Sequence, residues 1–125
     1  MLDHVSLGVV ALERAAKFYD VVLQPLGFVR VWTSEKAIGY GTQGSDDRLA
    51  LKEREGATPA GPGFHLALTA TSRAAVDSFH AAALRHGGAD DGAPGLRPAY
   101  GPGYYAAFVQ DPDGYSVEAV FHEPA

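Results

Sequence analysis

The order of apolar and polar positions along the chain follows one plan twice. Residues 2–9 alternate between apolar and polar side chains, which is typical of a half-buried β-strand. Residues 12–23 place apolar side chains at three- and four-residue intervals, and this spacing predicts an amphipathic helix. Three β-rich stretches follow, at Phe28–Thr33, Ala37–Thr42 and Arg48–Arg54. The first half of the chain therefore predicts the element order βαβββ.

The second half restarts the same plan after a linker rich in glycine and proline at residues 55–63. An alternating strand over residues 63–69 leads into a predicted helix at residues 73–86. The irregular segment Gly88–Gly103 is expected to contain one short strand, near Arg97–Tyr100.

Two strands complete the second half, Tyr104–Gln110 and Tyr115–His122. The residues between them, Asp111-Pro112-Asp113-Gly114, have the composition of a tight turn. The sequence thus predicts an α+β fold in a single domain over residues 1–125. It would consist of two βαβββ modules, at about residues 1–55 and 63–125.

Composition narrows the class of protein. A chain of 125 residues with 46% hydrophobic residues suits one domain with its own core. There is no cysteine, which excludes disulfides, thiolate metal sites and cysteine nucleophiles. The net charge is −5 and the 10 basic residues form no long run, so no nucleic acid partner is expected. With neither a signal-peptide pattern nor an apolar run of ~20 residues, we expect no membrane association and a cytoplasmic location.

Three residues able to bind a metal occupy matching places in the two halves. His4 lies on the opening strand of the first half, His65 on the opening strand of the second half, and Glu118 on the last strand. Because strand side chains alternate between two faces, all three are expected on the more polar face of their sheets. By the same internal equivalence, Ala50 occupies in the first half the place that Glu118 holds in the second. Two imidazoles and one carboxylate leave about three positions of an octahedral metal open for substrate.

Aromatic and basic side chains are the candidates for substrate contacts. Tyr105 is the preferred aromatic residue, since a four-residue turn at Asp111–Gly114 would set Ala107 opposite Glu118 and give Tyr105 the same parity. Further aromatic candidates for the pocket wall are Trp32, Tyr40, Tyr100, Tyr104 and Phe108. Basic candidates for recognising a carboxylate, a phosphate or a thiol conjugate are Arg48, Lys52 and Arg54.

The stretch from Phe108 to Glu118, with its Asp-Pro-Asp-Gly turn, resembles the ligand-bearing hairpin of the glyoxalase I/bleomycin-resistance/extradiol dioxygenase superfamily, which has the vicinal oxygen chelate fold. The opening Leu2-Asp3-His4-Val5, a helix containing Phe18-Tyr19, and then Leu26-Gly27-Phe28 are similar to that superfamily's first module. The resemblance covers essentially the whole chain. It implies two modules that form a cupped, partly open barrel of mixed sheet with the helices outside, usually in a homodimer.

Carried over residue by residue, the resemblance implies that His4, His65 and Glu118 bind a divalent metal, which would be Fe, Mn, Ni, Co or Zn. It also implies a small-molecule substrate that chelates the metal through two neighbouring oxygens. Ala50 stands where glyoxalase I has a fourth-strand carboxylate. In this respect the ligand pattern looks more like that of the extradiol dioxygenases.

Two classes of function stay open. The first is a metal-dependent enzyme with isomerase, lyase or ring-cleaving oxygenase chemistry, and the second is a metal-free small-molecule binding protein of the bleomycin-resistance kind. The presence of all three candidate ligands favours the enzyme. Thiol transfer to an epoxide antibiotic would also need a metal, and the sequence contains no specific phosphonate-binding signature.

Overall fold

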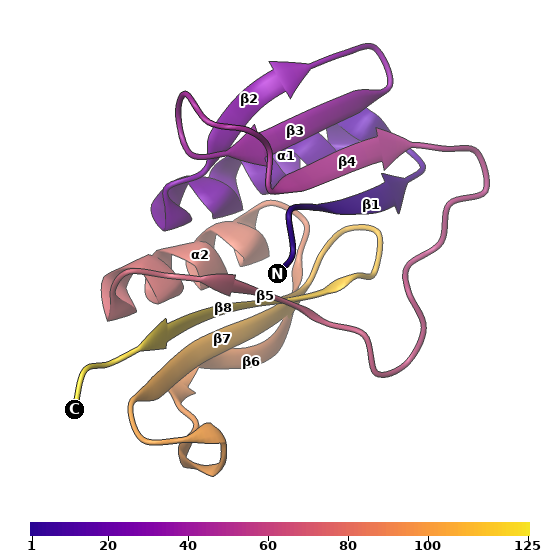
Figure 1. The fold of residues 1–125 in the computed structure, drawn as a ribbon. Coiled ribbons are helices and arrows are strands. Elements are labelled where there is room, and N and C mark those ends of the chain that lie inside the picture. Colours follow the sequence, from indigo (N-terminus) through magenta and orange to yellow (C-terminus); the bar gives the residue numbers. More distant parts are fainter.

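The computed structural model describes the whole chain, residues 1–125, and it confirms the α+β class and the two βαβββ modules (Figure 1). The first module contains β1 (Val5–Val9), α1 (Leu12–Leu23), the short 3-10 helix η1 (Gln24–Leu26), β2 (Val29–Thr33), β3 (Ala37–Gly41) and β4 (Leu49–Glu53). The second contains β5 (Leu66–Thr69), α2 (Arg73–Arg85), β6 (Ala89–Leu96), the 3-10 helix η2 (Pro98–Tyr100), β7 (Tyr104–Gln110) and β8 (Ser116–His122).

Each module forms its own four-stranded mixed sheet, and the two sheets are not closed into one barrel. The strand orders are β1-β4-β3-β2 and β5-β8-β7-β6, with one parallel pair in each sheet, β1/β4 and β5/β8. Ser6 pairs with Ala50 in the first sheet, and Ala67 pairs with Glu118 in the second. Since Ser6 and Ala67 lie two residues after His4 and His65, the expected equivalence of Ala50 and Glu118 is confirmed.

Local sequence accounts for the ends of the helices. In α1 the residues at helical spacing are buried, with Phe18, Tyr19 and Val22 fully inside. The segment that follows α1 ends at Gly27, whose φ of 87° is a left-handed conformation that glycine adopts at little cost. At the start of α2 the Ser72 side chain accepts a hydrogen bond from the backbone N–H of Ala75, a regular N-cap.

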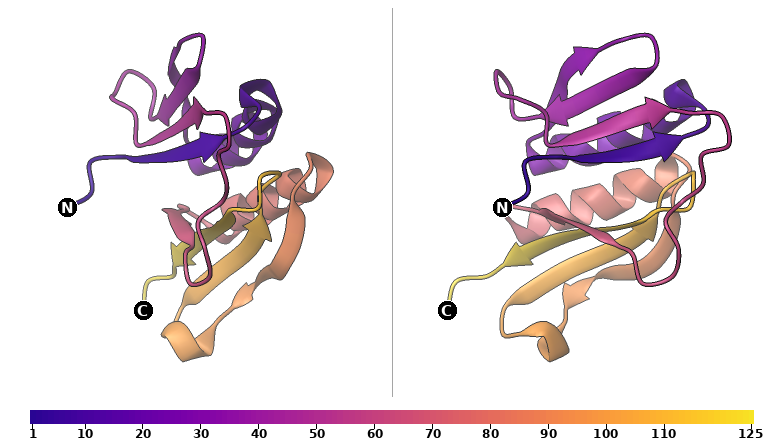
Figure 2. Two further views of the ribbon diagram at one scale, coloured as in Figure 1. Left: turned by 90° about the vertical axis from the view of Figure 1, so that its right-hand side faces the viewer. Right: turned by 45° about the vertical axis from the view of Figure 1, so that its right-hand side comes forward.

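The two helices form the middle of the molecule. They pack against each other, and the apolar core is one continuous cluster of 25 residues drawn from both modules. Each helix covers one face of its own sheet and leaves the opposite face open, and the two open faces point in different directions (Figure 2). No helix is both long and apolar enough to cross a membrane.

The turn between β7 and β8 fastens the second module to the first. The Tyr19 hydroxyl donates to Asp111 Oδ2 at 2.5 Å, and Arg14 pairs with Asp113 at 2.5 Å. The Tyr115 hydroxyl donates to the carbonyl oxygen of Gly8 at 2.7 Å. These contacts join α1 and β1 to the hairpin that carries Glu118, and so they set the orientation of one sheet against the other.

Two local expectations were wrong. The strand in the irregular segment is Ala89–Leu96 rather than Arg97–Tyr100, and Pro98–Tyr100 forms a 3-10 helix instead. Pairing with β7 makes β6 a strand despite its glycines and proline, and two register shifts absorb them. The turn after β7 was expected to have four residues, but Gln110 pairs with Ser116, so five residues, 111–115, lie between the strands. The Asp111 carboxylate holds this longer turn by accepting from the backbone N–H groups of Asp113 and Tyr115.

Candidate functional site

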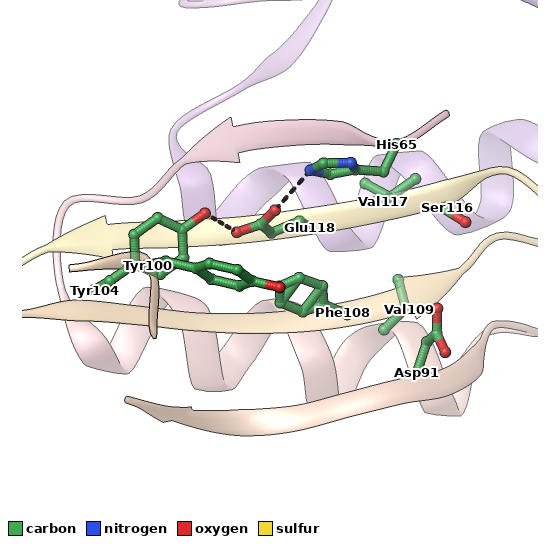
Figure 3. A pocket seen from close by; sticks show the side chains of 9 residues that line it. All are labelled: His65, Asp91, Tyr100, Tyr104, Phe108, Val109, Ser116, Val117 and Glu118. Atoms are coloured by element: carbon green, nitrogen blue, oxygen red, sulfur yellow. Dashed lines mark hydrogen bonds and ion pairs between the residues drawn. The ribbon is translucent and has the colours of Figure 1, made fainter. Parts of the chain in front are cut away.

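A pocket of about 500 Å³ lies on the open face of the second sheet (Figure 3). It is lined by one residue just before β5 and by residues of β6, β7, β8 and η2, all from the second module. They are His65, Asp91, Tyr100, Tyr104, Phe108, Val109, Ser116, Val117 and Glu118. The lining thus combines aromatic rings with two carboxylates and one imidazole.

Glu118 and His65 form the polar centre of this pocket. Glu118 projects from the third position of β8, and its side chain is only 2% exposed. His65 directly precedes β5, the strand paired with β8, and its Nε2 lies 3.1 Å from Glu118 Oε1. The His65 side chain is 56% exposed, so one partner is accessible while the other is at the floor of the pocket. A carboxylate and an imidazole this close can share a proton or a cation.

Tyr104 holds the second oxygen of Glu118. Its hydroxyl donates to Glu118 Oε2, and burial together with this hydrogen bond raises the pKa of Tyr104 to about 12. The phenol is therefore a neutral donor at physiological pH, and Glu118 Oε1 is left to face His65. Tyr100 packs edge-on against Tyr104 with 5.3 Å between ring centres, and it forms an exposed wall at the mouth of the pocket.

His4, the third predicted ligand, lies elsewhere in the chain. It precedes β1 in the first module, its ring Nδ1 is 2.7 Å from Asp3 Oδ1, and it does not line the pocket. Within one chain, no group of three His, Cys, Asp or Glu side chains is arranged to hold a metal ion. The structure therefore brings two of the three predicted ligands together and leaves His4 near the open face of the other sheet.

The predicted substrate residues Arg48, Lys52 and Trp32 also belong to the first module. Arg48 donates from Nη1 to the carbonyl oxygen of Asp3 at 3.3 Å, and Lys52 follows the core residue Leu51 on β4, so it points to the open face. Trp32 lies across Gly39, where an added Cβ would be 2.3 Å from the indole Nε1. These three residues thus lie with His4 on the open face of the first sheet, and none of the four lines the pocket in the second module.

Tyr105 lies on the opposite face of its sheet from Glu118, contrary to the expected register. Phe108 pairs with Glu118, whereas the four-residue turn would have set Ala107 there. This shift by one residue reverses every side chain of β7, so that the Tyr105 hydroxyl donates to Asp77 on α2 at 2.6 Å. Tyr104 takes the place expected for Tyr105.

Among the other aromatic candidates, Tyr100, Tyr104 and Phe108 line the pocket, while Tyr40 is fully buried in the core and donates to Asp20. Asp91 was missed altogether. It is the additional residue at the register shift between Asp90 and Gly92, and such a bulge has no reliable mark in the sequence. Tyr104 was among the predicted residues of the pocket wall, but its hydrogen bond to Glu118 was not predicted, because it depends on the length of the turn between β7 and β8.

Comparison with known proteins shows the family. The family model described as the Glyoxalase/Bleomycin resistance protein/Dioxygenase superfamily matches residues 1–119. A glyoxalase/bleomycin resistance protein from Albidiferax ferrireducens has a similar crystal structure, with a TM-score of 0.82 and 31% identity over 97% of both chains.

Two more distant structures share the fold alone. A glyoxalase-related enzyme from Fulvimarina pelagi is 23% identical, with a TM-score of 0.74 over 97% of this chain and 87% of its own. A mutant of glyoxalase I from Zea mays is 24% identical, with a TM-score of 0.70 over 95% of this chain and 45% of its own. A comparison with curated proteins gives no match. On the family model and the relative from Albidiferax ferrireducens, the chain belongs to the glyoxalase/bleomycin resistance protein/dioxygenase superfamily.

Proposed function

We propose that the protein is a metal-dependent enzyme that binds a small substrate at the pocket of the second module, on a divalent ion held by His65, Glu118 and the His4 of a second copy of the chain. The observation that carries the proposal is the approach of His65 Nε2 to within 3.1 Å of Glu118 Oε1, with Glu118 almost fully buried. A carboxylate is rarely buried unless it is paired or binds a cation.

The donor set fits a divalent ion of the first transition row. Imidazole nitrogen and carboxylate oxygen suit Fe, Mn, Co, Ni and Zn, and the chain contains no thiolate that would select a softer metal. Tyr104 supports the fit, because its hydrogen bond to Oε2 orients the carboxylate and directs Oε1 toward His65. Outer partners of this kind commonly orient metal ligands.

A second copy is needed because the two open faces of one chain do not meet. The contacts Tyr19–Asp111, Arg14–Asp113 and Tyr115–Gly8 hold the modules with their open faces apart. The matching registers of the two sheets place His4 in its module as His65 is placed in the other. If the first module of one copy covers the second module of another, His4, Arg48, Lys52 and Trp32 complete the wall around Glu118. The active form is then a homodimer with two equivalent sites.

The chemistry follows from the side chains around the site. The ion would act as a Lewis acid toward two neighbouring substrate oxygens and stabilise negative charge that develops there. Burial and its hydrogen bond to Glu118 raise the pKa of Tyr104 to about 12, so Tyr104 is a neutral phenol that holds Glu118 in place. Asp91 is the only other carboxylate in the lining and is exposed, so it can accept a substrate proton where glyoxalase I uses a carboxylate at the place of Ala50.

Metal analysis of the purified protein tests the site, with the variants His4→Ala, Glu118→Ala and, as a control, His86→Ala at the C-cap of α2, outside the pocket lining. About one equivalent of Fe, Mn, Ni, Co or Zn per chain is expected in the parent and control proteins, and its loss is expected in the other two. Iron would indicate oxygenase chemistry, and the other metals would indicate isomerase or lyase chemistry. No binding in the parent, even after anaerobic reconstitution, would contradict the proposal.

Mixing variants tests whether the site is shared between chains. In a dimer of one His4→Ala chain and one Glu118→Ala chain, one site carries both substitutions and the other carries none. Metal binding is therefore expected to return to one ion per mixed dimer after joint refolding. If mixing restores nothing while the parent binds metal, the site is completed within a single chain and the cross-chain assembly is wrong.

A second candidate function is metal-free binding of a small molecule. The observation that favours it is the lining itself, in which Tyr100, Tyr104 and Phe108 surround two carboxylates. In that function the imidazole of His65 contacts the carboxylate of Glu118 directly, without a metal ion, and a ligand binds equally well before and after treatment with a chelator. The same metal analysis separates the two functions.

A further inference from the structure

Arg97 places a positive charge beside the pocket that no carboxylate neutralises. Its guanidinium carbon lies 5.3 Å from the ring centre of Phe108, which lines the pocket. Its Nη2 donates to the carbonyl oxygen of Ala93 at 2.7 Å. Arg14, Arg30 and Arg73 are each paired with an aspartate or glutamate, whereas Arg97 is half-buried and forms no salt bridge. A guanidinium has five N–H donors, so most of those of Arg97 are free for a ligand.

The backbone of β6 is shaped around this guanidinium. A Cβ at Gly92 would lie 3.2 Å from Arg97 Nη2, and a Cβ at Gly95 would lie 3.1 Å from Nη1. Both glycines thus leave room for the planar group to rest on the strand. The same added Cβ at Gly92 would lie 3.3 Å from the Cβ of Phe108, which shows that the guanidinium and Phe108 are on one face of the sheet. Since Phe108 pairs with Glu118, this is also the face of the candidate metal ligands.

Strand spacing gives the separation between the two ends of this surface. Glu118 on β8, Phe108 on β7 and Gly92 on β6 are direct neighbours across three strands. At about 4.8 Å per strand, the guanidinium over Gly92 stands about 10 Å from Glu118. Phe108 lies on the strand between them, with its ring centre 5.3 Å from the guanidinium carbon. The surface therefore has a metal-binding end, an aromatic middle and a cationic end.

We infer that Arg97 binds a carboxylate at the far end of the substrate, and that the substrate is an elongated organic acid with vicinal oxygens at one end, an apolar or aromatic middle on Phe108, and this carboxylate at the other. The inference rests on the proposed function for the position of the chelating end. The position of the carboxylate end is inferred from Arg97 alone, because a guanidinium recognises a carboxylate through two parallel hydrogen bonds.

The test compares the binding of an acid with the binding of its neutral methyl ester. Binding is measured by calorimetric titration of the parent protein, of Arg97→Gln and of the control Arg85→Gln, in two arms. Arg85 is an exposed residue at the end of α2 and gives the same change of charge away from the pocket. In the first arm, protein treated with a chelator is titrated with 3-phenylpropionate or methyl 3-phenylpropionate. In the second arm, protein loaded with Co(II) is titrated with 3,4-dihydroxyhydrocinnamate or its methyl ester.

The parent and Arg85→Gln are expected to bind each acid about tenfold more tightly than its ester, and Arg97→Gln is expected to lose that preference. Unchanged ester binding by Arg97→Gln would show that the pocket is intact. A preference for the acid that persists in Arg97→Gln, or no binding of either acid to the parent protein, would overturn the assignment. If the preference depends on Arg97 in the first arm while Co(II) adds nothing in the second, the carboxylate site stands and the metal-dependent function is wrong.

Discussion

Replacement of Tyr19 by phenylalanine is the sharpest test of how the two modules are held together. Tyr19 is fully buried and Asp111 is 4% exposed, and the Tyr19 hydroxyl is the side-chain donor to Asp111 Oδ2. The variant leaves that carboxylate oxygen buried without this donor. The Oδ2 atom of the neighbouring Asp113 is also buried and has no hydrogen-bond partner. The turn therefore has no free donor that could replace the Tyr19 hydroxyl. A lost hydrogen bond to a charged group costs about 1.5–3 kcal/mol.

The pH dependence gives a second, independent signature. Burial raises the pKa of Asp111 above its ordinary value, and the hydrogen bond from Tyr19 works against that rise. The folded pKa of Asp111 therefore rises further in Tyr19→Phe. A group whose folded pKa is raised contributes stability that is present at low pH and is lost as the pH rises through the folded pKa. The cost of the substitution should thus be largest at pH 7 and should shrink as the pH falls through the raised pKa.

Urea unfolding at one protein concentration measures both effects, with Tyr105→Phe as the matched control. The Tyr105 hydroxyl donates to Asp77, which is exposed, so its loss should change stability by no more than about 0.5 kcal/mol. For Tyr19→Phe we expect a loss of about 2 kcal/mol at pH 7, and a smaller loss at pH 4. Equal losses in the two variants, or a loss that grows in acid, would refute the role assigned to the Tyr19–Asp111 contact.

Three further predictions concern the site and the core. Tyr104→Phe should weaken metal binding about tenfold or more, measured by competition with a chelator, because Glu118 loses its orienting donor; unchanged affinity would contradict that role. Gly39→Ala should displace Trp32, since the new Cβ would lie 2.3 Å from the indole nitrogen; fluorescence of this single tryptophan should shift, with a cost of about 1–3 kcal/mol. Phe79→Ala empties a fully buried position in α2 and should cost about 3–5 kcal/mol in urea unfolding, and a cost below about 1 kcal/mol would be inconsistent with the packing described.

The elements with a strong apolar period could be predicted from the sequence. The bounds of α1 agree with the prediction, and α2 ends one residue earlier than expected, because buried positions recur every three or four residues in both helices. The equivalence of Ala50 and Glu118 could also be predicted, since alternation along the strands is a local property. The alternation of side chains thus predicts which residues lie on the open face of each sheet, independently of how the two modules are arranged.

The register of β7 could not be predicted in the same way. It depends on whether four or five residues separate β7 from β8, and the sequence Asp-Pro-Asp-Gly-Tyr is compatible with both. The Asp111 carboxylate decides the question by accepting from the N–H groups of Asp113 and Tyr115, a contact between residues that only the folded turn brings together. Because one residue of slip exchanges the two faces, this single turn decides whether Tyr104 or Tyr105 meets Glu118.

The position of His4 shows the limit of alternation as a guide to a site. Alternation assigns His4 and Glu118 to corresponding faces, but it contains no information on whether those faces meet in one chain. That depends on the contacts between modules, above all the Tyr115 hydroxyl on the Gly8 carbonyl and the Tyr19 hydroxyl on Asp111. These contacts stabilise an arrangement in which His65 and Glu118 are together and His4 is apart. The residues that fasten the hairpin therefore bear on function as directly as the ligands do, since they leave each open face available to a second copy of the chain.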